Sequence, residues 1–379
     1  MARGLDLRTL RDGGQQATDV ADWIAEFLEP AKSTLDLAHY DFNLRPETAS
    51  IVGGAIRAAA ARGVAVRFVY NVDHRNPIPV PPPPEPDAKL IASLGVPARA
   101  IAGDPDLMHH KFVIRDGETV WTGSMNWTDD SFSIQENVLA TVTLPPLAAR
   151  YTAAFEQLWR TGIVEQSGFV DPVRLSVDGT PIRAWFTPGH GEDLSARIAK
   201  QIARARRRVR ICSPVLTAAP VLAILAQLAT EGELDLAGCV DEPQVRGVIY
   251  EWTRSGNATW KLPLLEQALR APFSGKPSTP WEPEGTPHDF MHAKVTVADD
   301  VIFLGSFNLS RSGERNAEDM LEIHDADLAD HLAAFVDEVR ALYPRFEPDD
   351  RPPVSDTGGA ARSRPTGPKP VSDTGEEQR

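Results

Sequence analysis

Two short segments of the chain carry the same reactive side chains in the same order. The first reads HHKFVIRDGETVWTGSMN and the second reads HAKVTVADDVIFLGSFN. Both contain His-x-Lys, then Asp, then Gly-Ser-x-Asn. The matched residues are His109, Lys111, Asp116, Gly123, Ser124 and Asn126 in the first copy, and His292, Lys294, Asp299, Gly305, Ser306 and Asn308 in the second. A pattern of this length that occurs twice indicates an internal repeat.

The residue types in this pattern suit a phosphate group. Lysine supplies positive charge, and serine and asparagine can donate hydrogen bonds to phosphoryl oxygens. Imidazole can attack phosphorus or transfer a proton. The cysteines and histidines of the sequence do not show the spacing of zinc ligands. The segments therefore predict a site that binds and reacts with a phosphate group, and no metal or other cofactor is expected.

Each copy of the pattern is expected to form a hairpin of two buried strands. Apolar runs at 112–114 and 295–297 end in Asp-Gly or Asp-Asp and are followed by second apolar runs. Because side chains alternate along a strand, the His and Lys of each motif should share one face. Asp116 and Asp299 follow strand ends at a turn, so we interpret them as structural supports of the motif.

These motifs resemble those of the phospholipase D superfamily, the HKD enzymes, which include phospholipases, phosphatidyl transferases and metal-independent nucleases. Glu136 and Glu318 each lie twelve residues after the motif serine, where this family usually has an acid that orients the histidine. The sequence after the second motif, NLSRSGERNAE, is closer to the family pattern than NWTDDSFSIQE in the first half. Both His-Lys-Asp sets are complete, so neither half looks inactive.

The resemblance implies a two-step cleavage in which both hairpins face one site. Family precedent favours His109 as the nucleophile that forms a phosphohistidine. His292 would protonate the leaving oxygen and then activate water or an alcohol, and Glu136 and Glu318 would fix the ring tautomers. The residues expected to hold the phosphoryl oxygens are Lys111, Lys294, Ser124, Ser306, Asn126 and Asn308. The remaining histidines are interpreted as structural.

The repeat also predicts an α/β fold with two related halves. Strand, helix and strand follow one another over 35–72 and again over 209–241, which predicts parallel units with right-handed crossovers. We expect two phospholipase D-like lobes, residues 1–165 and 166–346. Each should be a mixed, mostly parallel sheet flanked by helices, with the active site at the lobe interface.

Two stretches are not expected to join the packed lobes. Residues 77–86 contain seven prolines, which favour extended geometry and predict a stiff surface loop. Residues 347–379 have few apolar side chains and are expected to form a disordered tail.

Composition indicates an ordinary water-soluble protein. The net charge of −14, from 39 basic and 53 acidic residues, argues mildly against a broad nucleic-acid-coating surface. The N-terminal residues do not resemble a secretory signal. Since no run approaches the roughly 20 apolar residues that a membrane span needs, we expect a cytoplasmic protein without a transmembrane segment. No obligate protein partner is implied.

The motifs specify phosphodiester chemistry and little about the groups attached to the phosphate. A phospholipid head group, cleaved by hydrolysis or transphosphatidylation, is the favoured substrate because of the family's breadth, the acidic balance and the aromatic residues between Trp252 and Asp289. A metal-independent endonuclease acting on DNA or RNA is the alternative, since a cytosolic enzyme meets nucleic acid readily. A binding module with a decayed site is disfavoured because no motif residue is missing.

Overall fold

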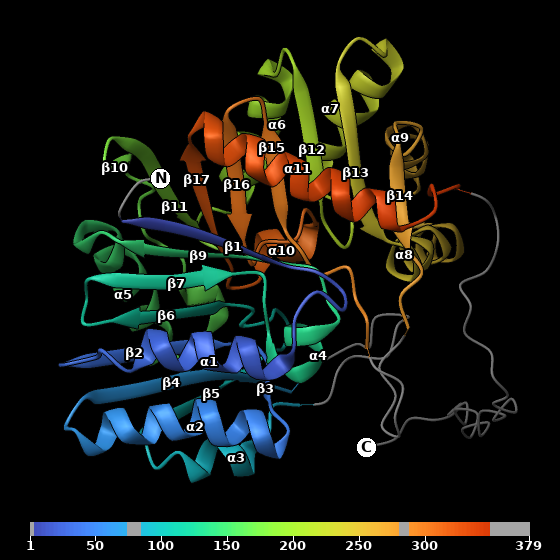
Figure 1. Ribbon diagram of the computed structural model, residues 1–379. Coiled ribbons are helices and arrows are strands. Elements are labelled where there is room, and N and C mark those ends of the chain that lie inside the picture. Colours follow the sequence, from blue (N-terminus) through green and yellow to red (C-terminus); the bar gives the residue numbers. More distant parts are fainter. Residues whose placement is uncertain (1–3, 74–84, 280–287, 349–379) are drawn as a thin grey trace, which may run out of the picture.

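The computed structural model describes residues 4–73, 85–279 and 288–348. Its two mixed β-sheets, one from each half of the chain, lie one above the other (Figure 1). Most of the expected proline-rich loop (77–86) and of the expected disordered tail (347–379) lies outside the described residues. No helix in the described part of the chain is long and apolar enough to cross a membrane.

The first half builds a seven-stranded sheet in the order β1-β9-β7-β6-β2-β4-β5. Pro46 starts α2 at a position where proline's fixed φ favours a helix, and Gly162 ends α5 in the left-handed conformation. The elements are β1 (Leu5–Leu10), α1 (Ala17–Leu28), β2 (Thr34–His39), β3 (Phe42–Asn43), α2 (Pro46–Ala61), β4 (Ala65–Val72), α3 (Ala88–Ser93), β5 (Ala98–Ala102), β6 (Lys111–Arg115), β7 (Thr119–Gly123), β8 (Trp127–Thr128), α4 (Asp129–Ser133), β9 (Asn137–Thr143), α5 (Pro145–Thr161) and the 3-10 turn η1 (Val164–Gln166).

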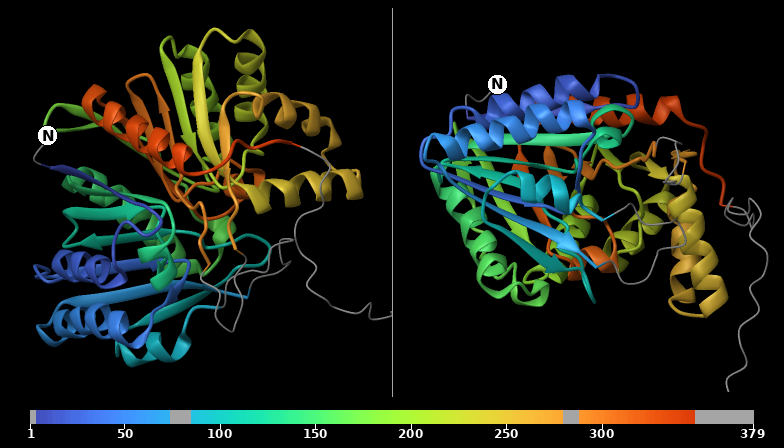
Figure 2. Two further views of the ribbon diagram at one scale, coloured as in Figure 1. Left: turned by 45° about the vertical axis from the view of Figure 1, so that its right-hand side comes forward. Right: turned by 90° about the horizontal axis from the view of Figure 1, so that it is seen from below.

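The second half builds an eight-stranded sheet in the order β10-β11-β17-β16-β15-β12-β13-β14. Its α8 extends away from both sheets (Figure 2). The elements are β10 (Leu175–Val177), β11 (Thr180–Phe186), α6 (Gly191–Arg204), β12 (Arg208–Cys212), α7 (Ala219–Glu231), β13 (Asp235–Asp241), α8 (Glu242–Ser255), the 3-10 turn η2 (Thr259–Lys261), α9 (Leu262–Ala268), β14 (Phe273–Lys276), β15 (Val295–Ala298), β16 (Val301–Gly305), α10 (Arg311–Arg315), β17 (Asp319–His324) and α11 (Ala326–Leu342).

The two sheets repeat one strand order, which confirms the predicted α/β fold with two related halves. The strands β9-β7-β6-β2-β4-β5 correspond in sequence to β17-β16-β15-β12-β13-β14. The expectation of mostly parallel sheets was wrong at the level of strand pairing. Parallel pairs join only β2, β4 and β5 in one sheet and β12, β13 and β14 in the other. Each motif hairpin adds antiparallel strands beside them. The lobe boundary at residues 165/166 stays a prediction.

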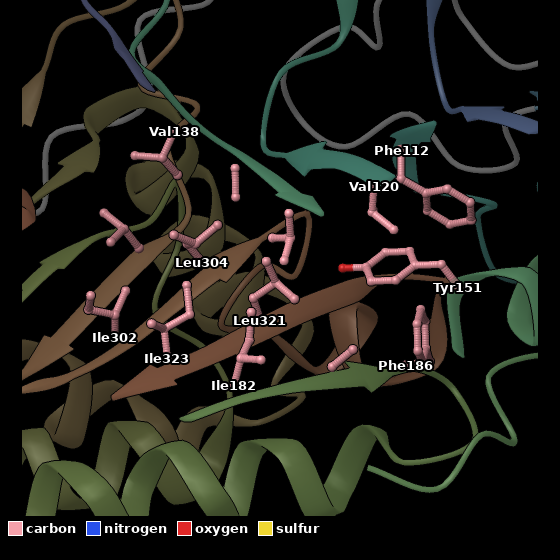
Figure 3. Packing of buried hydrophobic residues seen from close by; sticks show 14 of the residues in the cluster. Phe112, Val120, Val138, Tyr151, Ile182, Phe186, Ile302, Leu304, Leu321 and Ile323 are labelled. Carbon is pink, nitrogen blue, oxygen red and sulfur yellow. The ribbon is translucent and has the colours of Figure 1, made fainter. Parts of the chain in front are cut away.

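A shared hydrophobic core fixes the two halves against each other. Figure 3 shows Phe112, Val120 and Tyr151 of the first half close to Phe186 and Leu321 of the second. All five side chains are buried, and removing this apolar surface from water is the main favourable contribution to their association. The motif hairpins belong to this core, so the core also holds the two motifs in one relative position.

A buried polar cluster lies within the same interface. Asp319 accepts a hydrogen bond from the Tyr151 hydroxyl at 3.0 Å, and its Oδ1 lies 3.1 Å from His110 Nδ1. His110 is fully buried and packs edge-on against Phe112. These contacts support the interpretation of His110 as a structural residue.

Candidate active site

The two motif hairpins hold their lysines in the same way. Lys111 Nζ donates a hydrogen bond to the backbone oxygen of His109 at 2.7 Å, and Lys294 Nζ donates to the backbone oxygen of His292 at 2.7 Å. Both lysines are 1% exposed. The repeated sequence therefore produces a repeated local geometry, with His and Lys at the entrance to the first strand of each hairpin.

The motif aspartates lie at the hairpin turns. Asp116 has φ 55° and Asp299 has φ 52°, a left-handed conformation that Asp adopts more readily than most residues. The backbone N–H groups that donate to their carboxylates are those of Lys32, Ser33 and Thr34 for Asp116, and Arg206, Arg207 and Arg208 for Asp299. Burial alone would raise the pKa of each carboxyl, but these hydrogen bonds outweigh it and lower the pKa. Both aspartates tie a hairpin to the start of the neighbouring strand, in agreement with their interpretation as supports.

The reactive groups of the two halves meet at one place. The pKa of His292 is lowered well below its ordinary value, first by burial and then by the positive charges of Lys294, Lys111 and His109. Two of these charges belong to the other half of the chain. Backbone bridges also join Met108 to Ala317 and Met291 to Glu136, so the residue before each motif histidine contacts the other half of the chain.

His109 is oriented by a carboxylate from the second half. Its Nδ1 lies 2.7 Å from Glu318 Oε2, and its backbone N–H donates to the Ala317 oxygen at 2.9 Å. The Tyr40 ring packs against the imidazole with 4.6 Å between centroids. Burial raises the pKa of Glu318 to about 7, although Lys111 acts in the opposite direction. This arrangement engages Nδ1 and so fixes the orientation of the ring.

His292 is oriented by an amide instead. Its Nδ1 lies 3.2 Å from Asn137 Oδ1. The expected partner, Glu136, makes different contacts: it is fully buried, accepts from Lys276 Nζ at 3.0 Å and from the Tyr343 hydroxyl, and so links the two halves. The prediction that Glu136 fixes a histidine tautomer was therefore wrong, and Glu136 forms a buried ion pair.

Strand register explains this error. Gly123 lies opposite Leu139 in the first sheet, and Gly305 lies opposite Met320 in the second. Counting back two residues from each partner places Asn137 at the position of Glu318. The segment between Ser124 and Asn137 is one residue longer than the segment between Ser306 and Glu318. Counting twelve residues from Ser124 therefore ends at Glu136, one position before Asn137.

The motif serines fasten the next strand. Ser124 Oγ donates to Asn137 Oδ1 at 2.7 Å and accepts from the Val138 N–H at 3.0 Å. Ser306 Oγ accepts from the Asp319 N–H at 3.0 Å. Both hydroxyls thus hold the strand that carries the histidine partner.

The motif asparagines have unused hydrogen-bonding capacity. The Oδ1 atoms of Asn126 and Asn308 are buried and have no hydrogen-bond partner among the described residues. Since buried polar groups are normally paired, these two amides are available for a ligand in the site.

The lysines make the site suitable for an anion. Burial lowers the pKa of Lys111 to about 7, while Glu318, Asp319 and Asp41 act to raise it. Burial and the charge of Lys111 lower the pKa of Lys294. An anionic phosphodiester between them would stabilise both ammonium groups. Among the described residues, no group of His, Cys, Asp and Glu is arranged to hold a metal ion.

Comparison with known proteins agrees with this geometry. The family model described as “Cardiolipin synthase, PLD-like domain” matches residues 24–159 and 198–340, which is most of the chain. The chain belongs to the phospholipase D superfamily. The resemblance inferred from the two motifs is thereby confirmed.

Individual relatives match over shorter stretches. The human protein “Mitochondrial cardiolipin hydrolase” is 32% identical over 130 residues, 34% of this chain and 46% of that protein. The protein of the same name from Xenopus laevis is 49% identical over 53 residues, 14% of this chain and 25% of that protein. The chain thus spans about half, or less, of the length of these relatives.

Among solved structures, phosphatidylserine synthase from Haemophilus influenzae Rd KW20 superposes with a TM-score of 0.61 at 14% identity. The match covers 88% of this chain and 85% of that structure. At this identity the likeness supports the fold and carries no conclusion about substrate.

Proposed function

We propose that the protein is a phosphodiesterase that cleaves a phospholipid head group through a covalent phosphohistidine. The observation that carries the proposal is the meeting of two oriented imidazoles with two buried lysines. One imidazole comes from each half of the chain, and the partners are Glu318 for His109 and Asn137 for His292.

These contacts support a reaction in two steps. His109 Nε2 attacks phosphorus with its lone pair, the bond to the leaving oxygen breaks, and His292 gives its proton to that oxygen. Lys111 and Lys294 hold the phosphoryl oxygens and counter their charge throughout. In the second step, His292 removes a proton from water or an alcohol, whose oxygen attacks phosphorus and releases His109. The protonation states at the end equal those at the start.

The phospholipid substrate rests on the family and its named relatives. The matching family model and the curated relatives carry cardiolipin in their names, and the net charge of −14 does not favour a polyanionic ligand. Cleavage of DNA or RNA by the same histidines is the alternative that the experiment must separate.

The test uses phospholipid vesicles and, in parallel, single- and double-stranded DNA, all in the presence of EDTA. We expect head-group release by the wild type, and losses of about 10²–10⁴-fold or more in His109→Ala and His292→Ala. Denatured protein from a rapid quench should carry a phosphatidyl group on histidine in the wild type and none in His109→Ala. Nuclease activity without head-group release would refute the phospholipid substrate. Full activity of either variant would remove that histidine from the mechanism.

A further inference from the structure

Asp41 is a buried carboxylate that the reaction above does not use, and its sequence neighbour contacts the proposed nucleophile. It follows β2 and is the immediate neighbour of Tyr40, whose ring packs against His109 at 4.6 Å. Its side chain is buried, with 4% of the residue exposed. The charge of Lys111 lies close enough to lower the pKa of Asp41. Asp41 therefore forms part of the surroundings of the site on the His109 side.

One oxygen of this carboxylate is unsatisfied. Asp41 Oδ1 is buried and makes no hydrogen bond to any described residue. A buried acceptor without a donor costs free energy unless a ligand supplies the donor. Lys111 does not supply it: of its three N–H donors, the described contacts use one for the backbone oxygen of His109 and none for Asp41 Oδ1.

Two other carboxylates act on Asp41. Burial raises the pKa of Asp41 to about 7. The charge of Lys111 and a backbone hydrogen bond from Phe42 lower it, and the charges of Glu85 and Asp130 raise it. A cation at this position would relieve both the desolvation of Asp41 and its repulsion from the two neighbouring carboxylates.

The internal repeat shows that the fold does not require a carboxylate here. Phe42 pairs with Trp127 in the first half, and Leu216 pairs with Leu309 in the second. Trp127 and Leu309 each directly follow a motif asparagine, so Phe42 and Leu216 occupy equivalent positions. Asp41, which precedes Phe42, therefore corresponds to Val215, which precedes Leu216. The same hairpin, strand order and bridge are built with valine in the second half.

We propose that Asp41 binds a primary ammonium group carried by one of the two alcohols of the phosphodiester, as in an ethanolamine head group. This inference rests on the proposed function and narrows its substrate class. A primary ammonium supplies both the missing N–H donor and the positive charge. A glycerol head group supplies a donor without charge, and a second phosphate, as in a nucleic acid, is repelled.

The first test compares phosphatidylethanolamine with phosphatidylglycerol in mixed detergent micelles, with kcat/KM as the readout. The wild type should prefer the ethanolamine lipid by about tenfold or more, the effect of one charge-assisted hydrogen bond. Asp41→Val, which introduces the residue of the second half, should abolish that preference, so that the kcat/KM values for the two lipids become equal.

The matched control is Asp36→Asn. Asp36 is a buried carboxylate on β2, the strand that Asp41 follows; it is 5% exposed and pairs with Arg67 at 2.8 Å away from the site. This variant should keep the preference for the ethanolamine lipid. Equal use of the two lipids by the wild type, or an unchanged preference in Asp41→Val, would overturn the inference.

A binding measurement separates this inference from the proposed function. Titration calorimetry of the His292→Asn variant, which should not turn over substrate, would use glycerophosphoethanolamine and glycerophosphoglycerol as soluble ligands. Tighter binding of the first, lost in a His292→Asn, Asp41→Val double variant, would support the ammonium site even if no lipid were cleaved. Equal affinities would refute the ammonium site even if phospholipid cleavage were established.

Discussion

The orientation of His292 by Asn137 gives the sharpest test of the site geometry. Asn137 Oδ1 lies 3.2 Å from His292 Nδ1 and also accepts from the Ser124 hydroxyl at 2.7 Å. Asn137→Ala removes the acceptor, so the imidazole is free to rotate and to change its tautomer. We expect kcat to fall by about 10²–10⁴-fold, the range for a lost acid–base group, which corresponds to roughly 3–5 kcal/mol of activation free energy.

Asn137→Asp distinguishes orientation from simple loss of packing. It keeps the acceptor and adds a negative charge, as Glu318 does for His109 in the other half. A carboxylate at this distance favours the imidazolium, so the pKa of His292, which burial lowers, should rise by about one unit or more. We expect kcat to fall less than in Asn137→Ala, because the ring stays oriented although its proton is held more tightly. The pH–rate profile on a chromogenic phosphodiester should move to higher pH.

Glu136→Gln is the control, because Glu136 has the sequence position first assigned to this role. It breaks the ion pair with Lys276, which is 1% exposed. The ammonium then keeps Asp12, at 3.0 Å, and the backbone oxygen of Ile134, at 3.1 Å. Loss of the buried carboxylate should reduce the free energy of unfolding by about 3 kcal/mol. The kcat of the folded enzyme should stay near that of the wild type. A loss of kcat in Glu136→Gln as large as in Asn137→Ala, or an unmoved pH profile in Asn137→Asp, would refute the assignment drawn from strand register.

Two further predictions concern the hairpin turn and the lysines. Asp116→Ala should lower the free energy of unfolding by about 1–3 kcal/mol in urea titrations at pH 7, because it removes the hydrogen bonds of the turn and places alanine at φ 55°. Since the pKa of Asp116 is lowered in the folded state, its stabilisation is present above the unfolded carboxyl pKa of about 3.9 and is lost at lower pH. The difference from the wild type should therefore shrink below about pH 4, and a constant difference would contradict this origin. The affinity for a dialkyl phosphate, which does not titrate near neutrality, should fall as pH rises above about 7, because burial lowers the pKa of Lys111 to about 7 and the neutral amine no longer attracts the anion. Inhibition constants that stay flat from pH 6 to pH 9 would exclude this role for Lys111.

The duplicated fold could be predicted because the repeated residues are types that favour particular backbone conformations. The turn aspartates, the motif glycines and the alternating apolar runs fix each hairpin locally. The strand pairing was harder to predict, because β6 inserts between β2 and β7 although it comes later in the chain than β4 and β5. Neighbours in a sheet that are distant in sequence leave no local pattern. A mostly parallel sheet was therefore a reasonable but wrong expectation.

The site could be predicted where the repeat is exact and not where it varies. His109 and His292 were found from the motif, and the structure brings them together. Asn137 was missed because one extra residue in the preceding connection shifts the count, and only the pairing of Gly123 with Leu139 reveals the shift. Asp41 was missed because it has no motif. What distinguishes it is that the second half has valine, Val215, at the equivalent position. That equivalence is visible only from the backbone pairing of the residues that follow Asp41 and Val215.

The unequal partners of the two histidines support a division of labour between them. An imidazole that is phosphorylated on Nε2 and protonated on Nδ1 carries a positive charge, which a carboxylate at 2.7 Å, such as Glu318, would stabilise. The acid needs the opposite surroundings, because it must release its proton to the leaving oxygen. His292 has a neutral amide partner, and burial and the nearby lysines lower its pKa, so its proton is held weakly until the phosphate anion arrives. The asymmetry thus favours His109 as the nucleophile on physical grounds that do not depend on family precedent. Phosphate trapped on His292 in the wild-type enzyme would reverse the assignment, and Glu318 would then have to be explained as the partner of the acid.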